Sequence, residues 1–177
     1  RRRELLQGLD VNFEVKVKNT DESYPLDLPH TEVPAFIARK KFEAFIPELH
    51  ENDFLITADT IVINDSEILH KPTSILHAKE LIKKLSNNTH TVVTGVCFGT
   101  KNNLHVFSET TTVTFIEIAD EDIDYYVQAY KPLDKAGAYG VQEWIGYVGI
   151  SHINGSYFNV MGLPVHSLYA NILKNEI

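Results

Sequence analysis

One aspartate interrupts a run of strand-forming residues at positions 54–63, FLITADTIVI. Asp59 stands near its centre, although aspartate is rare in strands and a lone buried carboxylate is costly. One interpretation is structural, with the carboxylate satisfied by backbone amides at a bulge or strand end. The other is chemical, a general base or a metal ligand tuned by its surroundings. This stretch by itself leaves the two interpretations balanced.

Three lysines occupy positions from which an ammonium group could meet a phosphate. Lys40 and Lys41 fall among the apolar positions of a helix predicted over 32–46. Such a lysine either covers the core edge with its aliphatic stem or turns inward to an anion. Lys71 precedes Pro72 just before a predicted helix, either as a surface cation or as a phosphate contact.

Three further segments carry polar or charged residues. The first residues, RRRELL, oppose the macrodipole of a predicted helix, which either an anion docked there or a solvated basic turn would explain. Asp21 and Glu22 lie in a polar loop and are solvated unless folding brings them near Asp59. A loop at 134–142, DKAGAYGVQ, ends in Gln142, which either reads a base edge or caps the loop. The combination suits a phosphate-bearing ligand with a divalent metal.

Composition limits the class of protein. The chain has 177 residues, enough for one domain with a buried core. Its net charge of −8 argues against broad nucleic-acid binding. No apolar run reaches the roughly 18 residues of a membrane helix, so we expect no membrane partner. The one cysteine, Cys97, predicts a buried thiol without a disulfide, and the cytoplasm is the default location.

Hydrophobic periodicity predicts helices and strands that alternate early and strands that pair directly later. This order predicts an α/β fold with a mixed sheet. Strands are predicted at 11–17, 54–63, 89–100, 104–118 and 144–153, and residues 68–72 are predicted to form a short strand or a turn. Helices are predicted at 1–10, 32–46, 73–85, 120–130 and 164–175.

In order along the chain, nine stretches resemble the Maf family of house-cleaning nucleoside triphosphate pyrophosphatases. They are RRRELL, DES, IARKK, ITADTIV, ILHKP, LSNNTHTVVTGV, PLDKAGAYGVQ, INGSYFNVMGLP and the final helix. The resemblance implies a single domain over 1–177 with a mixed, mostly antiparallel central sheet, flanking helices and a nucleotide-binding cleft. It also implies a homodimer.

The implied activity is attack of water on the α-phosphorus, giving the monophosphate and pyrophosphate, with Mg²⁺ or Mn²⁺ as cofactor. Asp59 matches the family's proton acceptor, and with Glu22 it would hold the metal. Lys41 matches the helix lysine, which favours it over its neighbour, and Lys71 matches the lysine of the KP motif. These two lysines and Arg2 would bind the substrate.

Base preference is associated with positions that carry Arg1, Thr60 and Gln142 here. They match the dTTP/UTP branch rather than the 7-methyl-GTP branch, so we expect dTTP and UTP as substrates. Asp59 and Thr60 should project from opposite faces of their strand. If both touch one ligand, we expect a twist, bulge or strand end at 58–60.

The sequence departs from the family pattern at His70 and Glu143, where glycine is common, and neither departure removes a proposed catalytic group. The chain begins without Met, so we expect upstream residues that include the Ser and Pro of the family's first loop. Two alternatives stay open: a nucleotide-binding regulator of septum formation without essential turnover, and a related non-canonical purine triphosphatase. The retained ionisable residues weigh against the first, and the ADT and DKAGAYGVQ signatures weigh against the second.

Overall fold

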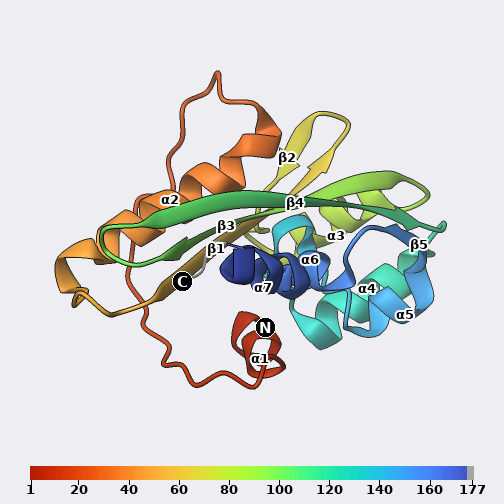
Figure 1. The fold of residues 1–177 in the computed structure, drawn as a ribbon. Coiled ribbons are helices and arrows are strands. Elements are labelled where there is room, and N and C mark those ends of the chain that lie inside the picture. Colours follow the sequence, from red (N-terminus) through yellow and green to blue (C-terminus); the bar gives the residue numbers. More distant parts are fainter. Residues whose placement is uncertain (175–177) are drawn as a thin grey trace. The chain divides into compact units, whose positions relative to one another are not determined.

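The computed structural model describes residues 1–174, and within them five strands form one sheet in the order β2-β1-β3-β4-β5 (Figure 1). The strand pairs β1–β2 and β4–β5 are antiparallel. A tight turn of Asp65 and Ser66, both with positive φ, joins the first pair, as expected of a two-residue hairpin. The strands are β1 (Leu55–Asn64), β2 (Glu67–Leu69), β3 (Thr89–Gly99), β4 (Leu104–Phe115) and β5 (Ile150–Asn154).

Contacts divide the chain into two compact units, and β1, β3 and β4 contribute residues to both. The first unit contains residues 1–60, 94–109 and, among the described residues, 162–174, and the second contains 61–93 and 110–161. Helices of the first are α1 (Arg2–Gln7), α2 (Val33–Phe45) and α7 (Val165–Lys174). Helices of the second are α3 (Ile75–Leu85), α4 (Asp120–Tyr130), α5 (Trp144–Gly149) and α6 (Tyr157–Met161).

In the first unit, α2 lies directly against the sheet. Ala38 and Phe42 of α2 pack on Cys97 of β3, and all three are buried. Gly95 allows this approach, because a Cβ there would lie 2.1 Å from the backbone nitrogen of Ala35. Burial raises the pKa of the Cys97 thiol to about 12, which confirms the predicted buried thiol.

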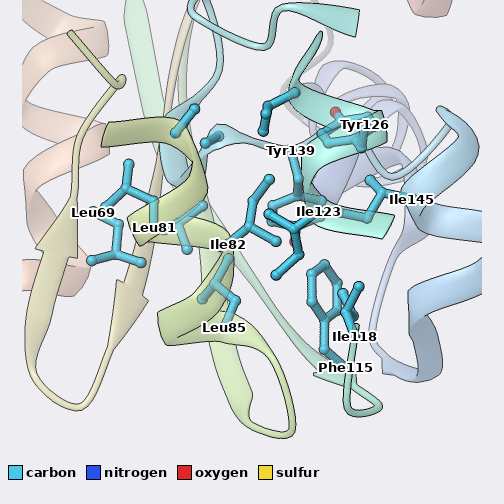
Figure 2. Packing of buried hydrophobic residues seen from close by; sticks show 14 of the residues in the cluster. Leu69, Leu81, Ile82, Leu85, Phe115, Ile118, Ile123, Tyr126, Tyr139 and Ile145 are labelled. Carbon is cyan, nitrogen blue, oxygen red and sulfur yellow. The ribbon is translucent and has the colours of Figure 1, made fainter. Parts of the chain in front are cut away.

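The second unit has a larger apolar core, built from α3, α4 and the sheet (Figure 2). Ser74 caps α3 by accepting a hydrogen bond from the backbone N–H of His77 at 3.1 Å. The inward face of α3 then buries Ala78, Leu81, Ile82 and Leu85. The core also includes Leu69, Phe115, Ile118, Ile123, Tyr126, Tyr139 and Ile145.

The α/β fold, with its sheet and flanking helices, confirms the predicted fold class. Most predicted elements occur within a few residues of their expected bounds, and the predicted end of the last helix at 175 lies outside the described residues. No helix among residues 1–174 is both long and apolar enough to cross a membrane.

Two strand predictions are wrong. Residues 11–17 have no regular secondary structure and are almost entirely exposed, because their alternating pattern finds no partner strand. The segment 144–153 begins as helix α5 and becomes strand β5 only at Ile150. Ile145 and Gly149, four residues apart, are buried while Tyr147 is 83% exposed, so the burial follows the helical period. The short helix α6 was not predicted, since NGS indicated only a turn.

One buried histidine predicts how stability depends on pH. His90 of β3 is 2% exposed, and its Nε2 lies 2.7 Å from the Tyr139 hydroxyl. Burial lowers the pKa of His90 from 6.5 to about 4. Below pH 6.5 the unfolded chain therefore binds a proton that the folded chain refuses until about pH 4. The free energy of unfolding should fall by up to about 3 kcal/mol as the pH drops through this window.

Urea unfolding at several pH values from 7.5 to 4 measures this dependence. His90→Gln should flatten it relative to the unmodified protein, because the histidine that titrates differently in the two states is gone. His152→Gln is the control, since His152 is exposed. An unchanged pH dependence in His90→Gln would contradict the assignment.

Candidate active site

Two carboxylates converge on one lysine in the first unit. The Lys41 Nζ lies 2.7 Å from Asp59 Oδ1 and 2.8 Å from Glu22 Oε1. Asp59 and Lys41 are largely buried, with side chains 14% and 20% exposed, whereas that of Glu22 is 51% exposed. Because a partly buried charge is tolerated when it is paired, the Lys41–Asp59 contact compensates both groups. The structure thus brings together three of the predicted site residues.

The register between α2 and β1 explains why Asp59 meets Lys41. Thr57, two residues before Asp59 and on the same face of β1, donates its hydroxyl to the Ala38 carbonyl at 2.7 Å. Lys41 follows Ala38 by three residues, which is nearly one helical turn. One face of β1 therefore contacts one face of α2 twice, through the Thr57 hydroxyl and through the Asp59 carboxylate.

Lys40 has a different role from its neighbour. Its Nζ donates to Asp21 Oδ2 and to the Ser23 carbonyl, both at 2.8 Å. Asp21 in turn accepts a hydrogen bond from the Ser23 backbone N–H at 2.9 Å. Hydrogen bonds from Lys40 and Ser23 hold the pKa of Asp21 well below its usual range, so this carboxylate is ionised in neutral solution. Lys40 thereby fixes the loop on both sides of Glu22.

A second group of hydrogen bonds surrounds the residue after Asp59. Arg2 donates from Nε to the Gly162 carbonyl at 2.8 Å and from Nη2 to the Thr60 hydroxyl at 3.1 Å. The Thr60 and Thr94 hydroxyls are 2.8 Å apart. Desolvation lowers the pKa of the Arg2 guanidinium and Asp59 acts in the opposite direction, and a guanidinium stays charged in proteins.

Strand β1 continues through residues 58–60, so no strand end lies there. The two neighbouring side chains instead have different partners. Asp59 accepts a hydrogen bond from Lys41, whereas the Thr60 hydroxyl contacts Arg2 and Thr94. Arg1 is exposed at the N-cap of α1 and contributes a further positive charge near Arg2. The cationic residues Arg1 and Arg2 therefore lie near strand β1, which carries the Asp59 carboxylate.

The donor atoms fit a hard divalent cation. Glu22 and Asp59 each place a carboxylate oxygen next to one point, the Lys41 ammonium, and Mg²⁺ prefers such oxygens. Within residues 1–174, no group of three or more His, Cys, Asp or Glu side chains could hold a metal alone. Mg²⁺ commonly uses one or two carboxylates and completes its shell with water and substrate phosphates. The metal assignment stays a prediction.

Two predicted site residues lie in the second unit. Lys71 is exposed and precedes the buried Pro72, after β2. Gln142 is half-buried, and in the described part of the chain its Oε1 is buried without a hydrogen-bond partner. A buried acceptor without a partner destabilises the fold unless a ligand donates a hydrogen bond to it. The roles of Lys71 and Gln142 also stay predictions.

The structure adds site residues that sequence reasoning missed. Ser23 is one, although Asp-x-Ser is a recognisable side-chain turn and could have indicated an ordered loop. Thr94 and the Gly162 carbonyl are others, and no local signal marks them. Their partners lie far away in the sequence, so only the folded chain reveals them.

Fold and site together define an α/β protein with a lysine–carboxylate centre suited to a phosphate-bearing ligand. A family model described as Maf-like protein matches residues 1–175, and the chain belongs to this family. It is 49% identical over 175 residues to a dTTP/UTP pyrophosphatase of Phocaeicola vulgatus, covering 98% of this chain and 91% of that protein. Proteins of the same name from Parabacteroides distasonis and Flavobacterium psychrophilum are 49% and 45% identical, covering 97% and 99% of this chain and 90% of each protein.

The contacts of Lys40 predict that it keeps the Glu22 loop ordered. In Lys40→Met, chymotrypsin should cleave at Tyr24 roughly three- to tenfold faster, because the loop loses the bonds from Lys40 to Asp21 and Ser23. Arg39→Met is the matched control, since it removes an ion pair with Glu43 from the same helix without touching the loop. Equal cleavage rates in the two variants would show that Lys40 does not hold the loop.

Proposed function

We propose that this protein is a nucleoside triphosphate pyrophosphatase that hydrolyses dTTP and UTP to the monophosphates and pyrophosphate. The observation that supports the proposal is the 2.7 Å contact between Lys41 and Asp59, which in this proposal act as the phosphate-binding cation and the general base. Curated relatives at 45–49% identity over nearly the whole chain, named dTTP/UTP pyrophosphatases, support the substrate. The proposed house-cleaning role rests on the family resemblance.

The proposed reaction is an in-line displacement. The oxygen of a water molecule attacks the α-phosphorus, and its proton passes to the carboxylate of Asp59. The bond from the α-phosphorus to the oxygen that bridges it to the β-phosphorus breaks, and pyrophosphate leaves with that oxygen and its electron pair. Catalysis of this kind depends mainly on positioning and charge neutralisation.

Lysines and arginines supply the neutralising charge in this proposal. Lys41 orients the Asp59 carboxylate and presents its ammonium to phosphate oxygens. Arg2 lies near Asp59, and Lys71, assigned from its KP motif, binds a further phosphate oxygen. A divalent cation held by Glu22 and Asp59 would, when bound, neutralise further phosphate charge.

Base recognition is assigned to Gln142, Thr60 and Arg1. The Gln142 Oε1, which has no hydrogen-bond partner within residues 1–174, suits the N3–H donor that thymine and uracil share and cytosine lacks. A site built around a buried acceptor discriminates against a base without the matching donor. Homodimer formation and a cytoplasmic location also belong to this proposal, and they rest on the family resemblance and on composition.

Turnover of a nucleotide panel tests the activity. With Mg²⁺ or Mn²⁺, dTTP and UTP should be converted to monophosphate and pyrophosphate faster than CTP, 7-methyl-GTP or ITP. Asp59→Asn should lower kcat by about 100-fold or more, because it removes the proton acceptor. Asp10→Asn is the control, an exposed aspartate in a left-handed turn that asparagine tolerates.

Some outcomes would contradict the proposed activity. If none of the nucleotides yields monophosphate and pyrophosphate, the protein is not a pyrophosphatase. In that case full function of an Asp59→Asn strain in cell division would favour the regulator of septum formation. A strong preference for ITP would favour a purine triphosphatase.

Metal dependence gives an independent prediction. Activity should disappear in excess EDTA and return with Mg²⁺ or Mn²⁺. Glu22→Gln should raise the Mn²⁺ dissociation constant measured by calorimetry roughly tenfold, because one carboxylate ligand loses its charge. Glu51→Gln serves as the control, an exposed acidic residue outside the cluster. Undiminished turnover in EDTA would refute the metal assignment.

A further inference from the structure

A largely buried ionic network adjoins the loop that carries Gln142. Lys135 Nζ is 3.1 Å from Glu143 Oε1 and 2.8 Å from Asp134 Oδ1. The Tyr126 hydroxyl donates to Glu143 Oε2 and accepts a hydrogen bond from the Gly140 backbone N–H at 3.1 Å. Lys135 and Glu143 have side chains only 10% and 19% exposed, whereas that of Asp134 is 67% exposed.

The network is anchored in the core of the second unit. Tyr126 is fully buried in the same cluster as Tyr139 and Ile145 (Figure 2). Burial and the hydrogen bond to Glu143 raise the pKa of Tyr126, so its hydroxyl keeps its proton at any physiological pH. A charge as buried as that of Glu143 persists only when partners satisfy it, and Tyr126 and Lys135 do so here.

The same groups fix the backbone around Gln142. The Glu143 backbone N–H donates to the Gly140 carbonyl at 3.0 Å, which closes a turn over residues 140–143. The Glu143 side chain also packs closely against Gly140. A Cβ added at Gly140 would lie only 2.8 Å from Glu143 Cδ. Gly140 is thus held from two sides, by the Tyr126 hydroxyl and by Glu143. Gln142 sits inside this closed turn with its Oε1 buried and unpaired within the described residues.

We propose that Glu143 is a positioning residue for base selection, which holds the Gln142 turn against Tyr126 and Lys135 so that the Gln142 acceptor meets a pyrimidine with an N3–H donor. This inference rests on the proposed function of Gln142. Rigid placement matters because an acceptor that moves away can be solvated, and the penalty for a base without the donor then disappears.

Selectivity is the measurement that separates positioning from mere stability. The ratio of kcat/KM for UTP to that for CTP should fall roughly tenfold in Glu143→Gln, which keeps the shape of the side chain and removes its charge. Tyr126→Phe, which removes only the hydroxyl, should lower the same ratio. The double variant should lose less than the two single losses combined, because both act through one network. Glu121→Gln is the control, since Glu121 is an exposed acidic residue of α4 outside the network and its replacement should leave the ratio unchanged.

Binding of the non-hydrolysable α,β-methylene analogues of UTP and CTP repeats the comparison without turnover, and thermal unfolding monitors the fold. The ratio of the two dissociation constants should shift in Glu143→Gln and Tyr126→Phe as the ratio of kcat/KM does. If either variant lowers the unfolding temperature while both ratios stay unchanged, the network is structural only and the proposal is overturned.

Gln142→Ala separates this inference from the proposed function beneath it. Loss of the UTP preference in Gln142→Ala and in Glu143→Gln supports both assignments. Loss in Gln142→Ala alone leaves base recognition intact and refutes positioning by Glu143. An unchanged preference in Gln142→Ala removes Gln142 from base recognition, and the positioning role fails with it.

Discussion

The candidate active site depends on the ion pair between Lys41 and Asp59. Each partner is mostly withdrawn from water, and each would destabilise the fold if the other were absent. The pair exists because α2 lies close against the sheet, through the missing side chain of Gly95 and the hydroxyl of Thr57. A strand that carries a largely buried aspartate therefore needs a cation packed against it, and this packing arrangement supplies Lys41.

The two carboxylates on Lys41 are supported differently. Asp59 belongs to an uninterrupted strand, whereas Glu22 belongs to an irregular loop fastened by Lys40, Asp21 and Ser23. The strand fixes the proposed proton acceptor, because proton transfer requires precise geometry. The loop, which is exposed and held by surface charges, leaves the second carboxylate more freedom to adjust to a metal or a phosphate.

The elements that the sequence predicted well are those with a complete local signal. Helix α3 has a capping serine and a clear apolar face, and β1 is apolar on both faces. The errors fall where the local signal was ambiguous. Residues 11–17 alternate as a strand but have no partner, and 144–149 form an apolar run whose burial follows a helical period.

The sequence by itself determined the fold class, the family and the types of residue available for chemistry, because these follow from local periodicity and motif order. Tertiary structure alone decided which groups meet. It paired Lys41 with Asp59, in agreement with the lysine that the family resemblance favours, and it joined Arg2 to the carbonyl of Gly162, 160 positions away. It also closed the network of Glu143 with Tyr126 and Lys135. Periodicity tells which face of an element is buried, but the partner on that face depends on how distant segments pack.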